Sequence, residues 1–307
     1  MTERPKNKNE LVHKTYPPWA HLIAGGAGGM LGAVITSPLE VVKTRLQARY
    51  HKSSLQSGFK FGFGTIRALS VLRREEGIKG LYRGLGPHLF GVVPSRAIYF
   101  FTYGTSKQLY IENLGMNPEG SAASFSAGVT AGAVVVTTTQ PIWLVKTRMQ
   151  LQTKTLEVKY KNSLDAILKI YKQEGLRVFY KGMTASYVGI SESSLQFVLY
   201  EKFRNIVKRR HGGRDDLHPL ECLAAASLSK LIASALTYPH EVIRTRLREP
   251  GKNIYKGVFN GLMLIYRTEG VPGLYGGMSA HLFRVVPNAA IMFLTYELVL
   301  RALSHQI

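Results

Sequence analysis

Residues 38–45 read Pro-Leu-Glu-Val-Val-Lys-Thr-Arg, and the same pattern returns twice further along the chain. It reads Pro-Ile-Trp-Leu-Val-Lys-Thr-Arg at residues 141–148 and Pro-His-Glu-Val-Ile-Arg-Thr-Arg at residues 239–246. Each copy stands at the end of an apolar segment that is rich in small residues. Such a recurrence predicts an internal repeat, which must be recognised before the rest of the sequence is interpreted.

A second signature follows each copy of the first. It consists of a Glu-Gly pair and then a further glycine, at Gly84, Gly182 and Gly277. Because the two signatures recur in phase, they indicate three copies of one structural unit.

The composition limits the classes of partner. The chain has 307 residues, with 40 Lys and Arg against 19 Asp and Glu, which gives a net charge of +21. So large an excess of positive charge predicts a polyanionic partner, and nucleic acid, anionic lipid and phosphorylated metabolites all qualify. The one cysteine, Cys222, excludes an intrachain disulfide, and we expect no cofactor and no metal cluster.

Residues 1–18 form a polar tail of mixed charge. The tail has neither the apolar core of a secretory signal nor the acid-poor, Arg-rich composition of a transit peptide. We therefore expect any organelle address to lie inside the mature chain.

Long charge-free stretches predict membrane spans. Residues 22–39 and 121–145 carry no charge, and residues 223–240 carry only Lys230. A helix needs about 20 mainly apolar residues to cross a bilayer. A second, less apolar run follows in each third, at 85–110, 183–203 and 278–300. The sequence thus predicts an all-α membrane protein with six transmembrane helices.

Shorter segments between the spans have apolar residues at helical spacing. They cover residues 63–75, 163–174 and 258–269. This pattern is typical of amphipathic helices that lie parallel to the membrane surface.

The repeated motifs resemble those of the mitochondrial carrier family. The resemblance rests on three copies of Pro-x-acid-x-x-base, each with its Glu-Gly pair and a Tyr-x-Gly at 82–84, 180–182 or 275–277, and it covers residues 19–302. It implies three repeats, 19–113, 119–210 and 218–303, that form one domain around a pseudo-threefold axis, with the amphipathic helices on the matrix side. It also implies a solute carrier of the mitochondrial inner membrane, working as a monomer by alternating access between a matrix gate and a cytoplasmic gate.

One branch of the family is favoured by further strings. Pro-Ile-Trp at 141–143 is similar to carriers of pyrimidine nucleotides, NAD, FAD and folate. Residues 94–97, 189–192, 229–234 and 238–249 resemble the pyrimidine nucleotide carriers in particular. The resemblance implies exchange of pyrimidine nucleotides or deoxynucleotides, such as UTP, TTP and CTP, between cytosol and matrix.

The family's pairing order implies a matrix gate of ion pairs between successive repeats. Its acids and bases would be Glu40 with Lys146 and Glu241 with Lys43, braced by Gln47 and Gln150. Trp143 replaces the acid opposite Arg244, so the third pair is missing. We leave open whether Arg244 meets a substrate phosphate or stacks on Trp143. The third brace position is Arg248, which puts that brace in doubt.

The cytoplasmic gate motif, aromatic-acid-x-x-base, is incomplete. Its matching residues are Tyr103, Lys107, Tyr200, Glu201, Arg204, Tyr296 and Glu297. Under the same pairing order, only Glu297 and Lys107 pair across repeats. We therefore predict a weak cytoplasmic gate and a resting state that is open to the cytosol.

Superposing the repeats on their shared glycine places Gly91, Gly189 and Arg284 in one column. The resemblance implies that substrate contacts lie there. Gly189 and Ile190 offer a flat apolar surface for a nucleobase, and Arg284 offers a planar fork that binds phosphate with two hydrogen bonds.

Four further residues are candidate contacts. Lys230 stands where the other repeats have glycine, which suits either a phosphate contact or a lysine that snorkels to the interface. Arg96 is a second phosphate candidate, and Asn288 a neutral polar contact. Glu192 either accepts a hydrogen bond from the base or ribose or pairs with Arg96.

Three alternatives stay open. A carrier for NAD, FAD or folate shares Pro-Ile-Trp, a non-transporting membrane protein would keep the same fold, and a soluble nucleic-acid-binding protein would explain the charge alone. No Walker loop, catalytic triad signature or metal-ligand spacing favours an enzyme. The remaining positive charge is expected to bind cardiolipin on the matrix side rather than nucleic acid.

Overall fold

The computed structural model describes residues 18–48, 63–118, 120–153, 159–210, 219–251 and 254–304. The predicted polar tail, apart from its last residue, lies outside these ranges. Within them the regular elements are helices, in agreement with the predicted all-α class.

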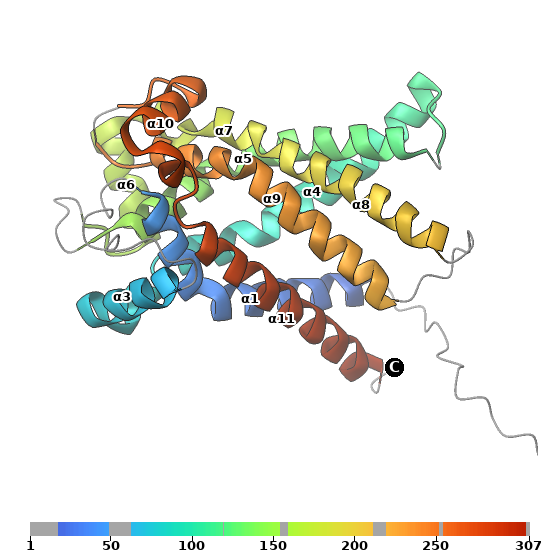
Figure 1. Cartoon of the computed structure of the whole chain (residues 1–307), viewed down its shortest axis with the longest axis horizontal. Helices are drawn as coiled ribbons and strands as arrows, with labels where there is room; N and C mark the ends of the chain where they lie inside the picture. Colours follow the sequence, from blue (N-terminus) through green and yellow to red (C-terminus); the bar gives the residue numbers. More distant parts are fainter. Residues whose placement is uncertain are drawn as a thin grey trace, which may run out of the picture.

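The long helices form one bundle (Figure 1). They are α1 (Pro18–Gln47), α4 (Leu85–Leu114), α5 (Ser121–Leu151), α8 (Ile190–Arg210), α9 (Pro219–Leu247) and α11 (Met278–Ser304). The short helix α7 (Met183–Val188) precedes α8, so the fourth crossing is broken at Gly189. Neighbours from successive repeats pack together along the bundle: α4 against α5, α8 against α9, and α11 against α1. The last contact closes the bundle into a ring.

Small residues allow the first and last long helices to approach closely. A Cβ atom on Gly28 would lie 2.8 Å from the carbonyl oxygen of Met292, and one on Gly32 would lie 2.7 Å from Oδ1 of Asn288. Close backbone approach of this kind is typical of helix pairs in lipid. Gly28 and Gly32 therefore serve the packing of α1 against α11.

The surface helices gather at the end of the bundle that lies away from the C-terminus (Figure 1). They are α3 (Phe63–Leu81), α6 (Ser163–Glu174), the 3-10 helix η1 (Leu176–Tyr180) and α10 (Val258–Leu274). Gly77, Gly175 and Gly270 have φ of 70°, 76° and 67°, so each Glu-Gly pair interrupts or ends its helix in a conformation that favours glycine.

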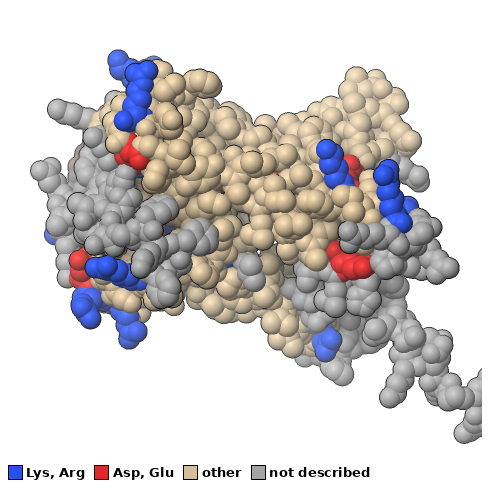
Figure 2. All heavy atoms as spheres, in the orientation of Figure 1, with Lys and Arg blue, Asp and Glu red and all other residues tan. Residues whose placement is uncertain are grey.

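The surface of the bundle suits a bilayer. Within the described ranges, three helices are long and apolar enough to cross a membrane by length and composition alone: residues 23–47, 121–151 and 278–303. Figure 2 shows Lys and Arg near the two ends of this face, with an uncharged belt of described residues between them. Large apolar side chains such as Phe90, Phe101 and Leu236 are exposed. Such a surface is stable only against lipid or a partner.

Candidate functional site

Within each repeat, a buried arginine from the first motif pairs with the glutamate of the Glu-Gly pair. Arg45 Nη1 lies 2.7 Å from Glu76 Oε1, and Arg246 Nη1 lies 2.5 Å from Glu269 Oε1. Arg148 and Glu174 form the equivalent pair. These contacts give a structural role to the recurrent arginine and to the glutamate of the Glu-Gly pair, although the sequence analysis assigned none.

The same three arginines also reach the following repeat. The Nε atom of each arginine donates to a backbone carbonyl oxygen of that repeat. The bonds run from Arg45 to Gln150 at 3.0 Å, from Arg148 to Arg248 at 3.1 Å, and from Arg246 to Gln47 at 2.9 Å. Three equivalent bonds form a closed ring around the pseudo-threefold axis. Their in-phase recurrence in the sequence is the signal that could have identified them.

The predicted matrix gate residues meet inside this ring. Lys146 Nζ lies 2.6 Å from Glu40 Oε1, and Lys43 Nζ lies 2.5 Å from Glu241 Oε2. All four side chains are buried. The structure therefore holds both ion pairs that the pairing order implies, while their role as a gate stays a prediction.

Trp143 stands at the third gate position. Its Nε1 donates to Thr139 Oγ1 at 2.9 Å, and Lys146 Nζ lies 4.8 Å from the centroid of its ring. Arg244 Nη2 instead lies 3.3 Å from Glu241 Oε1. The interpretation that Arg244 stacks on Trp143 is therefore corrected: the cation over the ring is Lys146, which lies one turn along the same helix.

A hydroxyl-centred brace supports each gate position. Thr44 Oγ1 donates to Gln150 Oε1 at 2.9 Å, and Thr245 Oγ1 donates to Gln47 Oε1 at 2.7 Å. At the third position, Arg248 Nη1 donates to Thr147 Oγ1 at 3.3 Å. Although the sequence put this brace in doubt, an arginine occupies it and contacts the equivalent threonine.

Two histidines adjoin the gate carboxylates, and the sequence analysis missed both. His88 Nδ1 lies 3.0 Å from Glu40 Oε2, and His281 Nδ1 lies 3.8 Å from Glu241 Oε2. They occupy the same place after Gly84 and Gly277, so the superposition that aligned Gly91 with Arg284 would have aligned them too. In repeat two, which lacks the gate acid, the equivalent residue is Ser186.

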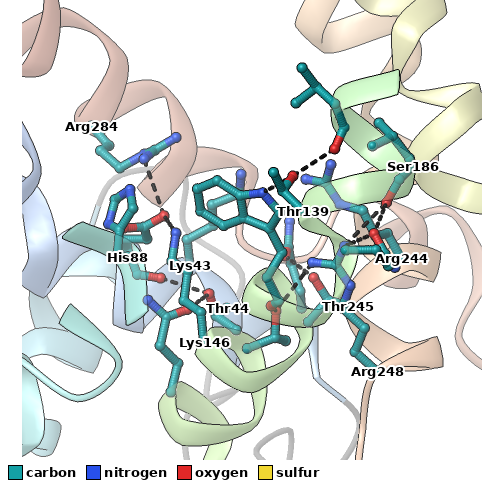
Figure 3. Close-up of a pocket in the computed structure, with 18 residues that line it drawn as sticks. Lys43, Thr44, His88, Thr139, Lys146, Ser186, Arg244, Thr245, Arg248 and Arg284 are labelled. Carbon is teal, nitrogen blue, oxygen red and sulfur yellow. Dashed lines mark hydrogen bonds and ion pairs between the residues drawn. The ribbon is translucent and has the colours of Figure 1, made fainter. Parts of the chain in front are cut away.

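A cavity of about 340 Å³ lies above the ion pairs. Five cationic side chains line it: Lys43, Lys146, Arg244, Arg248 and Arg284. Figure 3 shows Arg284 reaching toward the gate, where its Nη1 lies 3.4 Å from Glu40 Oε1. Arg284 Nε is buried and has no hydrogen-bond partner among the described residues. This narrow cavity can therefore hold a ligand that carries several negative charges.

A wider cavity of about 610 Å³ adjoins the narrow one. Its lining is mainly apolar and includes the aromatic side chains of Tyr99, Phe100, Tyr103, Phe125 and Phe197. Val135, Val136, Ser186 and Arg244 line both cavities. A ligand that lies across this junction can bury a flat ring on one side and present charge on the other.

The predicted substrate residues fall into two groups. Gly189 and Ile190 line the wider cavity, and Arg284 lines the narrow one. Gly91, Arg96 and Asn288 are not among the described residues that line either cavity. A Cβ on Gly91 would lie 3.0 Å from Ile142 and 3.6 Å from the Trp143 ring, so Gly91 serves helix packing. Asn288 packs against α1, and Arg96 is exposed.

Glu192 and Lys230 form an ion pair. Lys230 Nζ lies 2.7 Å from Glu192 Oε1, and Ser234 Oγ donates to the same oxygen at 2.7 Å. Glu192 thus pairs with Lys230 and not with Arg96, which corrects one of the two interpretations of this carboxylate. Lys230 meets a protein partner within the bundle rather than reaching for the interface.

The predicted cytoplasmic gate is only partly described. Tyr103 stacks on Tyr99 with ring centroids 6.1 Å apart, and Ser121 Oγ donates to Glu201 Oε1 at 2.9 Å. Arg204 is exposed, whereas Lys107, Tyr200 and Tyr296 are partly buried. The side chain of Glu297 lies outside the described residues, so the Glu297–Lys107 pair stays a prediction.

Comparison with known proteins agrees with the repeats. The family model of the mitochondrial carrier protein matches residues 14–114, 117–211 and 215–306. Mitochondrial carrier protein rim2 of Schizosaccharomyces pombe is 40% identical, over 96% of this chain and 93% of its own length. The mitochondrial pyrimidine nucleotide transporter RIM2 of Saccharomyces cerevisiae is 40% identical, over 95% of this chain and 88% of its own. Solute carrier family 25 member 33 of Homo sapiens is 40% identical, over 92% of this chain and 95% of its own.

These matches span all three repeats, and the ring of arginines, the two ion pairs and the central cavities follow the same threefold plan. They confirm the resemblance drawn from the motifs and the prediction that the protein is not an enzyme. The chain belongs to the mitochondrial carrier family and is a multi-pass mitochondrial membrane transporter.

Proposed function

We propose that this protein exchanges pyrimidine nucleotides and deoxynucleotides across the mitochondrial inner membrane by alternating access. The observation that carries the proposal is the junction of the narrow cationic cavity with the wider apolar cavity at Arg244. The 40% identity to a relative named as a pyrimidine nucleotide transporter supports the choice of substrate.

The substrate binds across this junction. Its phosphates lie in the narrow cavity, where Arg284 has an unpaired Nε and Arg244 is partly exposed. Its base lies in the wider cavity, against Gly189 and Ile190. A dicarboxylate would satisfy fewer of the cations and would leave the apolar surface empty.

Transport requires no chemical step on the nucleotide. The two matrix ion pairs close the path on one side, and substrate in the narrow cavity weakens them because its charge competes with Glu40 for Arg284 and Lys146. Two pairs hold less tightly than three would, so the missing acid at Trp143 eases opening. The carrier works as a monomer, and cardiolipin binds on the matrix side to the basic residues of the Tyr-x-Gly sequences, Arg83 and Lys181.

The test is exchange by purified protein in liposomes that contain cardiolipin. The liposomes hold UTP, labelled UTP is added outside, and unlabelled TTP, CTP, ATP, NAD, FAD and malate compete for uptake. Inhibition by TTP and CTP, but not by ATP, NAD, FAD or malate, is the expected result. Exchange of NAD or FAD without exchange of UTP would move the protein to the related branch.

A further inference from the structure

The two matrix ion pairs leave one junction between repeats without a pair. Glu40–Lys146 joins repeats one and two, and Glu241–Lys43 joins repeats three and one. At the junction of repeats two and three, the pairing order sets Trp143 against Arg244, so the motif supplies no carboxylate there. The threefold set of ion pairs is therefore incomplete at this level of the bundle.

The ion pair between Glu192 and Lys230 joins the same two repeats. Glu192 belongs to α8 in repeat two, and Lys230 belongs to α9 in repeat three. The two atoms lie 2.7 Å apart, and Ser234 donates a second hydrogen bond to the carboxylate. Glu192 is buried, whereas the side chain of Lys230 is 33% exposed. The acid is thus fixed in the protein, and the base remains accessible.

Lys230 is not among the described residues that line either cavity, but the repeat pattern places it at the same height of the bundle. Counted back from the motif proline, Lys230 is equivalent to Gly132 and Ser234 is equivalent to Val136. Gly132 lines the wider cavity, and Val136 lines both. At this position repeat two has a glycine, on which a Cβ would lie 3.5 Å from Ile190, so the lysine replaces a packing contact with a charge.

We propose that Glu192 and Lys230 are a relocated inter-repeat ion pair that takes the place of the missing gate pair, and that a substrate phosphate competes with Glu192 for Lys230. The second part rests on the proposed function. A lysine within the bilayer is costly unless an anion neutralises it, so one anionic partner has to replace the other. Nucleotide binding would thereby release the junction of repeats two and three, which the matrix pairs do not hold.

This arrangement predicts opposite effects for the two partners. In Glu192→Gln, Lys230 loses its competitor, so the KM for UTP exchange should fall by about threefold. In Lys230→Gln, the KM for UTP should rise by about tenfold and the KM for UMP by less, because UMP offers fewer phosphates. A purely structural pair would raise KM or lower kcat similarly in both variants and for both nucleotides, which would overturn the proposal.

The double variant separates competition from independent effects. Because Glu192 acts through Lys230, Glu192→Gln should change the KM little once Lys230→Gln is present. Additive changes would contradict the competition. The matched control is the surface pair of α6, in which Lys169 Nζ lies 2.9 Å from Asp165 Oδ2. Asp165→Asn and Lys169→Gln should leave both KM values unchanged.

The ion pair is tested without substrate by thermal melting of the purified protein in detergent. Each single variant should lower the melting temperature, and the double variant should lower it by less than the sum. Additive losses would show that the two residues do not hold the junction together.

A failure of the proposed function can be distinguished from a failure of the competition between Glu192 and phosphate. If the wild type exchanges no pyrimidine nucleotide, sodium tripolyphosphate, which has no base, replaces UTP as the probe. Glu192→Gln should then be protected against melting at lower tripolyphosphate concentrations than the wild type. Protection at equal concentrations would overturn the competition whatever the natural substrate is.

Discussion

The Nη2 atom of Arg244 lies 3.3 Å from Oε1 of Glu241, one helical turn earlier in α9. The same carboxylate pairs with Lys43 at 2.5 Å, so one acid serves two cations. The cause is Trp143, which supplies no carboxylate to Arg244 from the neighbouring repeat. Among the described residues, the ion-pair partner of Arg244 therefore lies in its own helix, and Arg244 lines both cavities.

Restoring the third acid should slow transport. In Trp143→Glu, a carboxylate can pair with Arg244 and join repeats two and three at the matrix gate. A gain of about 1 kcal/mol in the closed state, which is typical of a modest ion pair, corresponds to a roughly fivefold lower exchange rate. The measurements are the rate of UTP exchange and the melting temperature, which should rise.

Trp143→Gln is the control for this prediction, because it removes the ring without adding charge. Its melting temperature should not rise. If Trp143→Glu exchanges UTP as fast as the wild type, the missing pair does not limit the opening of the gate.

Removing Arg284 should weaken nucleotide binding. A hydrogen bond to a charged group contributes about 1.5–3 kcal/mol, so Arg284→Gln should raise the KM for UTP by at least about tenfold. The KM of Arg284→Lys should lie between those of the wild type and Arg284→Gln, because lysine keeps the charge but loses the planar fork. The exposed Arg73 of α3 supplies the control, and Arg73→Gln should leave KM unchanged. Wild-type KM in both Arg284 variants would exclude this residue from the site.

Glycines in the same left-handed backbone conformation should differ in their tolerance of a side chain. Gly84 has φ 77° and ψ 7°, and Gly115 has φ 61° and ψ 25°. A Cβ on Gly84 would lie 2.9 Å from the Lys146 carbonyl oxygen, whereas one on Gly115 would meet no heavy atom within 4 Å. Gly115→Ala should cost about 1–2 kcal/mol of stability, from backbone strain alone. Gly84→Ala should cost more, because α4 and α5 must also move apart there. Thermal melting of the two variants provides the comparison, and equal losses would contradict it.

The Arg148–Glu174 pair should make stability depend on acid pH. Burial of Glu174 favours its protonated form, but the hydrogen bonds and charge of Arg148, with Lys181 Nζ at 3.3 Å, outweigh burial and hold the pKa of Glu174 below its ordinary value. A carboxyl with a lowered folded-state pKa stabilises the fold above its unfolded pKa of about 4.3, and this contribution is lost as the pH falls through the folded-state pKa. Glu174→Gln should therefore melt earlier than the wild type at neutral pH.

The difference in melting temperature between the wild type and Glu174→Gln should narrow as the pH falls below the unfolded-state pKa of the carboxyl group. Glu75→Gln, which changes an exposed carboxyl on α3, should leave the melting temperature unaltered. A gap that stays constant with pH would contradict the linkage.

The repeats and the long helices could be predicted from the sequence because their signals are local. The motif, the Glu-Gly pair and the charge-free stretches each lie within one segment. Among the residues that the structure describes, three helices pass as membrane spans by length and composition. The weaker crossings were predicted because each follows the same signatures as its equivalents.

Contacts between repeats were harder to predict. The partners of Glu40 and Glu241 came from the family's pairing order, and the structure has them at 2.6 and 2.5 Å. No such order covered Glu192, whose partner depends on how α8 is rotated against α9. Gly91 shows a related limit, because an aligned column gives the height of a residue in the bundle but not its direction. Trp143 fills the space beside that glycine.

The ring of arginine-to-carbonyl bonds has a consequence for biogenesis. Its last bond runs from Arg246 Nε to the carbonyl oxygen of Gln47 at 2.9 Å, and therefore joins the third repeat to the first. During synthesis, nearly two hundred further residues must be added after the end of α1 before this hydrogen-bond partner is present. Until then the carbonyl oxygen lacks this partner, and water at the membrane surface can donate to it instead. The third repeat thus closes the ring of hydrogen bonds, and a nascent carrier reaches its final fold only when this repeat has been inserted.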